Sequence, residues 1–181
     1  MSVEFSADLT EMNKLEEYLK ENQIPYNRFD NEWYGGFNRH QIVVYEDSEK
    51  TKYSWDAICH YGSYGYEDGL LEVMGAPVLR DDEDVCGYLT AEDVIERYEE
   101  SLKTYVFTFG SGQKNAGHYV KIKARDWDSA RAKMFSYFGE EWAFQYSIDV
   151  WQDWIEDLKK MDAMYLLETE IPLPDAPVSA G

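Results

Sequence analysis

The fold is constrained most strongly by the order of two kinds of segment along the chain. In one kind apolar residues recur at helical spacing, and the other kind consists of short apolar runs with strand character. Apolar side chains recur at helical spacing in residues 8–21 and 90–102, and shorter runs with strand character lie between these two segments. A similar alternation returns after residue 103, where two strand-like runs precede a helical one and another helical pattern comes last. Strands and helices mixed in this order predict an α+β fold of small antiparallel sheets backed by helices.

Local signals define where the helices begin and end. Thr90 and Asp93 stand three residues apart, in the relation of a capping box, at the start of the second helix. The third helix is predicted over residues 128–138, and Gly139 is placed to end it in the left-handed conformation. The last helix is predicted to run over residues 147–167.

The predicted strands are short. They cover residues 26–29, 41–45, 53–59, 105–109, 118–124 and 143–146. The second and third flank a polar stretch and are expected to pair as a hairpin, whereas residues 70–73 are too few to assign. A phosphate cradle usually connects a strand to a helix N-terminus. The glycine-rich residues 110–117 connect two strand patterns instead, so they favour a hairpin loop.

Acidic residues are unevenly distributed along the chain. Residues 1–103 hold 24 acidic and 9 basic side chains, and residues 104–181 hold 12 and 8. This change in charge predicts two closely packed modules, an acidic α+β module over 1–103 and a ββαβα module over 104–170. Residues 171–181 include three prolines and no pattern, so we expect a flexible tail there.

Bulk composition excludes several classes of protein. A net charge of −19 argues against direct binding to nucleic acid phosphates and to anionic membranes. The chain has no apolar run of about 18 residues, so no transmembrane helix is expected, and its start shows no secretory signal. Apolar residues make up 44% of the chain and aromatic residues 16%, enough for a folded core.

Cys59 and Cys86 are expected to be reduced thiols, with a disulfide as the alternative.

Catalytic residue types occur without a catalytic spacing. A cysteine nucleophile requires a base within reach. His60 directly follows Cys59, but neighbours on a strand point to opposite faces, so only His40 or His118 could serve, through the fold. We therefore expect Cys59 to be a buried structural residue and the protein to be no enzyme.

Metal and cofactor sites are not indicated either. Cys59, His60, Cys86 and His118 show no zinc-type spacing. The acidic run Asp81–Asp84 lacks the alternating ligands and central glycine of a calcium loop. We expect no metal and no cofactor.

Three acidic clusters fall in predicted loops of the first module. They are Glu46, Asp47 and Glu49; Glu67 and Asp68; and Asp81, Asp82, Glu83 and Asp84. Carboxylates at such spacing can imitate a row of phosphates and engage the arginines of a nucleic-acid-binding groove. A solvated loop is the commoner explanation of any single cluster. For three clusters in one strongly acidic module, a surface that binds a partner protein becomes a competing explanation.

A loop rich in tyrosine and glycine, residues 60–69, adjoins the second cluster. Tyr61, Tyr64 and Tyr66 alternate there with Gly and Ser, a composition typical of the contact loops of binding proteins. Tyrosine supplies a large contact area at a small cost in conformational entropy. We assign these three tyrosines to the partner surface, with burial in the core as the alternative.

A basic island covers residues 113–133. Its candidate contact residues are Lys114, Lys121, Lys123 and Arg125. They could contact a nucleic acid backbone or an acidic partner surface. Pairing with the protein's own acidic half, residues 1–103, is the slightly favoured alternative.

Two segments resemble proteins of mobile genetic elements. Residues 55–75, WDAICHYGSYGYEDGLLEVMG, followed by residues 87–96, are similar to segments of small acidic proteins encoded by phages and mobile elements of Gram-positive bacteria. Residues 105–146, from YVFTFGSG to EEWAFQY, resemble a recurrent small phage module. Some such proteins are anti-CRISPR proteins, which block the RNA-guided nuclease of type II systems. The resemblance transfers no individual functional residue.

The residues and the resemblance together predict a non-enzymatic inhibitor that acts in the cytoplasm of a bacterial host. Its expected partner is the type II CRISPR nuclease with its guide RNA, whose target DNA binding or cleavage a DNA-mimicking acidic surface would block. Contact with nucleic acid is secondary, and no membrane is involved. The alternatives are an anti-restriction DNA mimic aimed at another nuclease, and a small enzyme that uses Cys59 with His40 or His118.

Overall fold

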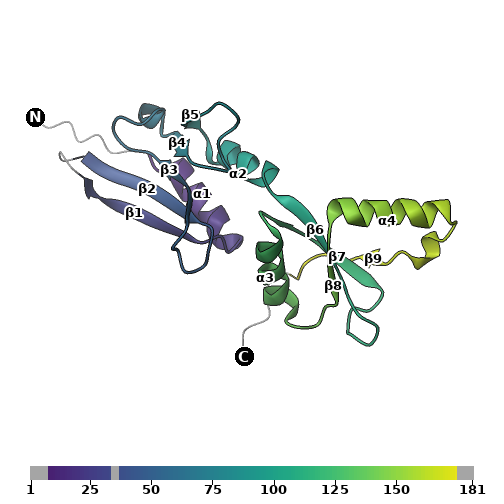
Figure 1. Ribbon diagram of the computed structural model, residues 1–181. Coiled ribbons are helices and arrows are strands. Elements are labelled where there is room, and N and C mark those ends of the chain that lie inside the picture. Colours follow the sequence, from purple (N-terminus) through teal and green to yellow (C-terminus); the bar gives the residue numbers. More distant parts are fainter. Residues whose placement is uncertain (1–7, 34–36, 175–181) are drawn as a thin grey trace, which may run out of the picture. The chain divides into compact units, whose positions relative to one another are not determined.

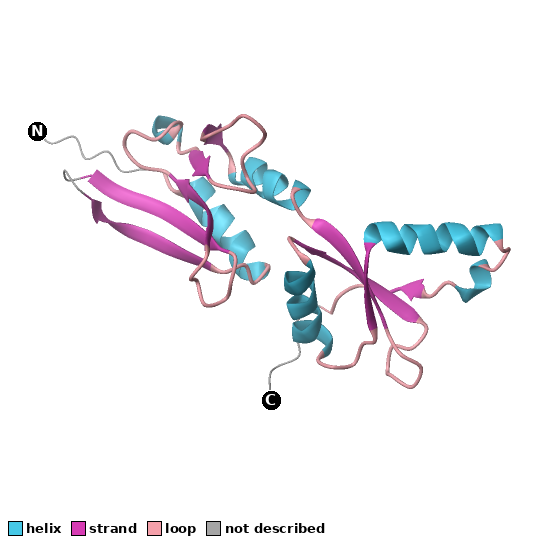
Figure 2. Cartoon of the chain, viewed as in Figure 1, coloured by secondary structure: helices cyan, strands magenta, loops and turns pink. Residues whose placement is uncertain are grey.

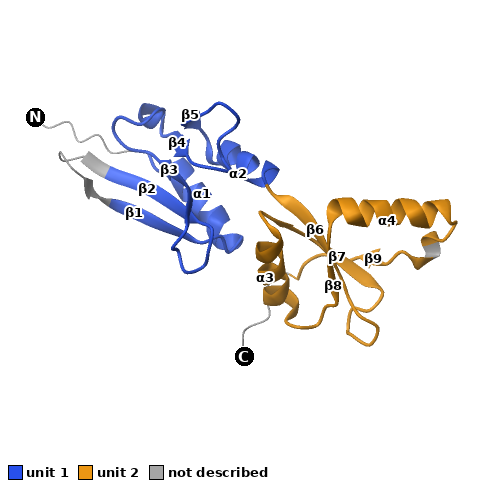
Figure 3. Ribbon diagram, viewed as in Figure 1, with its two compact units in different colours: residues 1–101 blue, residues 102–181 orange. Residues whose placement is uncertain are grey.

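The computed structural model describes residues 8–33 and 37–174, and the chain divides into two compact units, Met1–Ser101 and Leu102–Gly181 (Figure 3). The change in charge along the sequence predicts this division at residue 103. Each unit combines helices with one β-sheet, which confirms the α+β class (Figure 2).

Unit 1 is a five-stranded antiparallel meander with two helices (Figure 1). The helices are α1 (Thr10–Glu21) and α2 (Ala91–Glu100), and η1 (Tyr66–Asp68) is a short 3₁₀ helix. The strands are hydrogen bonded in sequence order: β1 (Tyr26–Trp33), β2 (Phe37–Tyr45), β3 (Tyr53–Ile58), β4 (Leu71–Met74) and β5 (Cys86–Leu89). The predicted hairpin of β2 and β3 is confirmed, and β5 is a strand that the sequence does not predict.

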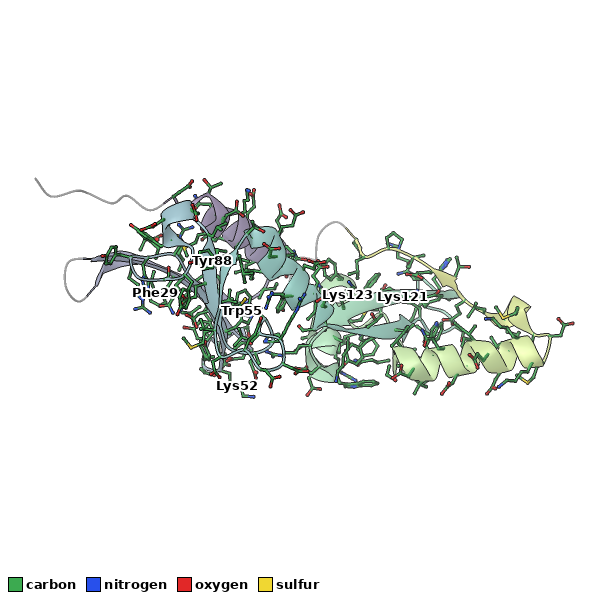
Figure 4. The ribbon with its side chains drawn as sticks, turned by 90° about the horizontal axis from the view of Figure 1, so that it is seen from above. Phe29, Lys52, Trp55, Tyr88, Lys121 and Lys123 are labelled. Carbon is green, nitrogen blue, oxygen red and sulfur yellow. The ribbon has the colours of Figure 1, made fainter. Side chains whose placement is uncertain are left out.

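Both helices of unit 1 pack on the same face of its sheet. They contribute to one apolar core, which includes Met12, Leu15, Leu19, Ala91, Val94, Ile42, Val44, Trp55, Ala57, Leu71 and Val73. Trp55 is fully buried in this core, and its ring lies 5.9 Å from that of Tyr98 on α2 (Figure 4). The predicted capping box at the start of α2 is confirmed: the Thr90 hydroxyl accepts from the Asp93 amide, and the Asp93 carboxylate accepts from the Thr90 amide.

The opposite face of this sheet carries no helix in the described part of unit 1 and is crossed by a chain of polar contacts. Arg39 lies over the Phe29 ring, at 4.7 Å, and donates to the Gln41 side chain. Gln41 Nε2 donates to Asp56 Oδ2 at 2.6 Å, and the Tyr53 hydroxyl donates to Asp56 Oδ1 at 2.5 Å. Asp56 is only 7% exposed. These hydrogen bonds let a carboxylate stay shielded from water on an uncovered face.

Unit 2 has helices on both faces of a four-stranded mixed sheet, β8-β6-β7-β9. Its elements are β6 (Lys103–Thr108), β7 (His118–Ala124), α3 (Trp127–Phe138), β8 (Phe144–Ser147), α4 (Ile148–Lys160), η2 (Met164–Leu166) and β9 (Thr169–Glu170). Strand β9 runs parallel to β7, so this sheet is mixed rather than wholly antiparallel. Residues 110–117 join β6 to β7 as the predicted hairpin loop.

Alternation along β6 divides the core of unit 2 in two. Phe107 packs with Ala130 and Met134 of α3, whereas its neighbour Val106 packs with Trp151 of α4. Successive side chains of a strand point to opposite faces, so a sheet between two helices needs apolar residues in an unbroken run. Tyr105, Val106 and Phe107 in β6 meet this requirement, and the buried Thr108 interrupts the apolar run before Phe109.

Helix α4 ends at Lys160, earlier than the predicted residue 167. Asp162 takes the left-handed conformation, with φ of 54°, and the Ala163 amide donates to the Leu158 carbonyl at 2.8 Å. Further on, Ile171 and Leu173 fall in the predicted tail but pack against the α3 side of the core. Residues 175–181 of that tail lie outside the described residues.

Candidate functional site

The meander of unit 1 distributes the three predicted acidic clusters over the two ends of its sheet. Successive loops of an antiparallel meander lie at alternate ends of the sheet. The β2–β3 loop, residues 46–52, and the β4–β5 loop, residues 75–85, therefore share one end (Figure 1). The β3–β4 loop, residues 59–70, with the tyrosines, lies at the opposite end. The predicted partner residues thus do not converge on a single spot.

The β2–β3 cluster is largely occupied with its own turn. The Asp47 carboxylate accepts hydrogen bonds from the Lys52 amide at 2.7 Å and from the Thr51 amide and hydroxyl. These bonds lower the pKa of the Asp47 carboxyl. Glu46 lies 3.5 Å from the Lys52 ammonium, and Glu49 is exposed. The loop geometry accounts for Asp47 without a partner protein.

The β4–β5 loop is attached to α2 by Glu83. Its carboxylate accepts from Arg97 Nη1 at 2.7 Å and from the Arg80 amide at 2.9 Å. These two hydrogen bonds, led by that from Arg97, lower the pKa of Glu83 to about 2. Asp81, Asp82 and Asp84 are exposed and make no hydrogen bond or ion pair with any described residue. Glu83 therefore positions the loop, and its three neighbours project their charge outward.

Helix α2 contributes further carboxylates that the sequence analysis missed. Glu92, Glu96 and Glu100 are four residues apart and exposed, opposite the buried Ala91 and Val94. Glu92 and Glu96 have no hydrogen-bond or ion-pair partner among the described residues, and Glu100 lies 3.4 Å from Arg80. The spacing of four is a signal of one helix face that the sequence already contains.

These α2 and loop carboxylates adjoin one another, and we call them the acidic strip. It consists of Asp81, Asp82, Asp84, Glu92, Glu96 and Glu100. Contacts of Arg97 with Glu83 and of Arg80 with Glu100 join the loop to the C-terminal half of α2. At the other end, α2 begins directly after β5, whose Leu89 pairs with Leu71 beside the β3–β4 loop. The strip therefore runs along α2 from the tyrosine loop to the β4–β5 loop.

The tyrosine loop exposes two of its three predicted tyrosines. Tyr61 is 55% and Tyr64 57% exposed, whereas Tyr66 is half-buried against the core and meets the Tyr61 ring edge-on at 6.2 Å. Tyr88 on β5, which sequence analysis did not single out, is 63% exposed and its ring lies 6.3 Å from that of Tyr64. Glu67 and Asp68 of η1 are also exposed.

The backbone around the Tyr64–Tyr88 pair is constrained. A Cβ at Gly87 would lie 2.2 Å from the Tyr64 Cβ, so only glycine lets β5 approach the loop this closely. Tyr88 itself has φ of 59°, a left-handed conformation that is unfavourable for a bulky residue. No local sequence signal predicts this conformation. A strained and highly exposed aromatic residue points to a role in binding.

The predicted basic contacts lie at different places in unit 2. Lys121 and Lys123 share one face of β7, with Lys114 in the preceding loop and Arg125 after the strand (Figure 4). Lys121 forms an ion pair with Glu170 at 2.7 Å, and Arg125 lies 3.6 Å from Asp126. Lys121 therefore pairs within unit 2, and not with the acidic half of the chain that the favoured alternative names.

The register of β1, β2 and β3 brings together Asp30, His40 and Cys59, the residue types of a thiol-based active site. His40 Nδ1 lies 2.8 Å from Asp30 Oδ1, and the Cys59 amide donates to the His40 carbonyl. The thiol, however, is fully buried and contacts the Asp8 carbonyl at 3.7 Å. Burial and the nearby Asp8 charge raise the pKa of Cys59 to about 11. A protonated thiol without access to solvent is a poor nucleophile.

The remaining chemical possibilities find little support. Both cysteines are free thiols, with Cys59 buried and Cys86 half-buried. His118, the other base considered for Cys59, belongs to β7 of unit 2. Within residues 8–33 and 37–174, no three His, Cys, Asp or Glu side chains are arranged to hold a metal ion. In the same residues, no helix has the length and apolar character needed to cross a membrane.

Comparison of the chain with protein-family models, with curated proteins and with solved structures gives no match.

Proposed function

We propose that this protein is a non-enzymatic inhibitor that binds the cationic groove of a nucleic-acid-processing enzyme. The acidic strip carries this proposal, because it places six exposed carboxylates along one helix and an adjoining loop. Arginine and lysine side chains that normally contact phosphates would engage these carboxylates instead.

The density of charge along the strip can be compared with that of DNA. Residues four apart on a helix are separated by about 6 Å along its axis. One strand of a DNA duplex carries a charge about every 3.4 Å. Glutamates on α2 alone are therefore sparser than phosphates, and Asp81, Asp82 and Asp84 raise the density at one end. The electrostatic field of the strip would accelerate the encounter of the protein with its cationic partner. Added salt would weaken this attraction.

Tyr64 and Tyr88 would supply the contact area that charge alone does not. Desolvated aromatic side chains at the centre of an interface commonly contribute much of the binding energy. Surface ion pairs contribute little by themselves, about 0–1 kcal/mol each. In this proposal the strip guides the partner, and the two tyrosines hold it.

The finer part of the proposal concerns the partner. We infer the guide-loaded nuclease of a type II CRISPR system in the cytoplasm of a bacterial host, with the protein encoded by a phage or mobile element. This inference depends on the resemblance of residues 55–75 and 105–146. The second candidate is a restriction nuclease, since a phosphate-like strip suits either groove.

The decisive experiment measures binding of the whole chain to the guide-loaded nuclease at low and high salt. The variant Glu92→Lys, Glu96→Lys, Glu100→Lys should bind at least about tenfold more weakly. Its matched control, Asp149→Lys, Asp153→Lys, Glu156→Lys, reverses three exposed carboxylates on α4 and should bind within about threefold of the parent protein.

Two outcomes of this experiment would decide between the two candidate partners, and a third would test the acidic strip itself. Binding that target DNA displaces supports the CRISPR nuclease. Absence of binding there, with salt-sensitive binding to a restriction nuclease, favours the second candidate. Equal effects of the α2 and α4 variants would overturn the strip as the binding surface.

A further inference from the structure

A groove in unit 2 lies between helix α3 and the edge strand β8. It has a volume of about 400 Å³ and is lined by Trp127, Arg131, Phe135, Glu140, Trp142, Ala143, Phe144 and Gln145. This volume is within the range of roughly 300–1,000 Å³ found for ligand pockets. Its aromatic lining is partly open to solvent, since Trp127, Phe135 and Phe144 are exposed.

One wall of the groove is a sheet edge. Strand β8 is the first in the order β8-β6-β7-β9, and among the described residues it pairs with β6 alone. An edge strand presents backbone N–H and C=O groups that can pair with another extended chain. Phe144, at the start of β8, is 62% exposed. An unpaired edge beside an apolar groove is the arrangement by which proteins bind extended peptides as an added strand.

Two polar groups of the groove have no charged or hydrogen-bonding side-chain partner among residues 8–33 and 37–174. Arg131 lies over the Trp142 and Phe135 rings, at 4.9 and 5.7 Å from their centroids, yet forms no ion pair with any described carboxylate. Gln145 donates from Nε2 to the Trp127 carbonyl at 2.9 Å, whereas its buried Oε1 has no hydrogen-bond partner in the described part of the chain. In a chain with 36 acidic residues, an exposed arginine without a carboxylate partner is conspicuous.

We propose that the α3–β8 groove binds an extended segment of a partner protein, which adds to β8 as a strand and carries an apolar side chain and an acidic one. The apolar side chain would enter among Trp127, Phe135 and Phe144. The acidic one would pair with Arg131, whose guanidinium the Trp142 ring already orients. Glu140 in the same groove disfavours a polyanion, so a peptide of mixed charge fits better than a nucleic acid.

This surface belongs to unit 2 and is separate from the acidic strip, so it can be tested whether or not the proposed function holds. The test selects peptides from a random display library on the full chain and remakes the best as labelled synthetic peptides. Apolar and acidic residues are expected at alternate positions, because side chains of a strand alternate between faces. Failure to enrich such a pattern would overturn the proposal.

Variants identify the groove as the site. Arg131→Glu and Phe144→Asp should each weaken peptide binding about tenfold or more. Two matched controls on exposed positions of unit 2, Lys159→Glu and Leu166→Asp, should change it less than about twofold. All four proteins should retain the thermal unfolding midpoint of the parent. Equal binding by groove and control variants would contradict the assignment.

Backbone pairing is tested separately with N-methylated peptides. Methylating alternate residues in one register should abolish binding, and methylating the other register should leave it intact, because only one set of amides faces β8. If both sets bind, strand addition is wrong. Sedimentation of the free chain tests the other possible occupant of the groove, a second copy of the chain. A dimer that Phe144→Asp dissociates would assign the groove to that second copy instead.

Discussion

The two units use the same kinds of element but differ in how their sheets are covered. In unit 1 both helices lie on one face, and the described part of the other face is held by polar contacts around Asp56. In unit 2, α3 and α4 cover opposite faces, and apolar residues line both. The excess of acidic residues belongs to the unit with the one-sided core. Unit 1 thus carries most of the excess acidic charge, and unit 2 has the core on both faces of its sheet. The two units should therefore respond differently to substitutions in their cores.

The largest expected effect concerns the core of unit 1. Trp55→Ala removes its central, fully buried side chain and should cost about 3–5 kcal/mol. Hydrogen exchange should then show lost protection in β2 and β3 with protection retained in β6 and β7. The counterpart Met134→Ala should cost about 2–5 kcal/mol and do the reverse. An equal loss in both sheets from either variant would show that the units unfold as one.

The N-terminal caps of α2 and α3 allow a matched comparison between the units, with a smaller expected loss of stability. Thr90 caps α2 in unit 1, and Asp126 caps α3 in unit 2 by accepting from the Ser129 amide at 2.7 Å. Thr90→Ala and Asp126→Ala should each cost about 1 kcal/mol in denaturant unfolding. The exposed Ser48→Ala serves as the control, and a cap variant no less stable than this control would contradict the assigned cap.

Acid should weaken unit 1 through Glu83. Its pKa is about 2 in the folded protein against an ordinary 4.5, so the unfolded chain binds a proton more readily. The stabilisation is therefore complete above about pH 4.5 and is lost as the pH falls towards 2. Glu83→Gln should flatten the dependence of the urea midpoint on pH in this window. Curves of equal slope for the two proteins would refute the contribution of the Glu83–Arg97 pair.

The smallest effect is expected at Tyr88. Tyr88→Gly relieves the left-handed backbone, which costs a bulky residue roughly 1 kcal/mol, although glycine adds entropy to the unfolded chain. Stability should therefore rise slightly or remain unchanged, while affinity for the partner falls. Tyr61→Gly, at an exposed position without a positive φ, should give no such gain. A clear loss of stability in Tyr88→Gly would show that the tyrosine serves packing rather than binding.

Local signals in the sequence predicted most of the fold. The capping box at Thr90, the end of α3 at Gly139 and strand β7 over residues 118–124 all follow from short-range patterns. Gly139 has a positive φ of 58°, but its ψ of −132° lies outside the left-handed helical region that the sequence predicts. Strands β5 and β9 could not be predicted, because their few residues are extended only through pairing with β4 and β7. The early end of α4 depends on a left-handed Asp162, which aspartate tolerates but does not require.

The sequence indicates which types of residue form the candidate site, but it indicates less well how the fold arranges them. Asp81, Asp82 and Asp84 are exposed in a loop, as the sequence indicates. The separation of Tyr64 from that loop follows from the order of the strands, which the sequence does not specify. Glu92 and Glu96 could have been found by treating helical charge spacing as carefully as apolar spacing. Tyr88 could not, since it lies on β5, a strand that the sequence does not predict, and has a left-handed φ that no local signal indicates.

The unequal depth of the two cysteines provides a ready means of labelling. Cys59 is sealed in the core, whereas the half-buried Cys86 lies beside Glu83 and Arg97, the pair that fixes the acidic loop to α2. Burial raises the pKa of the Cys86 thiol, so a maleimide dye should attach to the unaltered chain at this one position, next to the strip, when the pH is made mildly alkaline. Its fluorescence would report a partner's approach in real time, without any engineered residue.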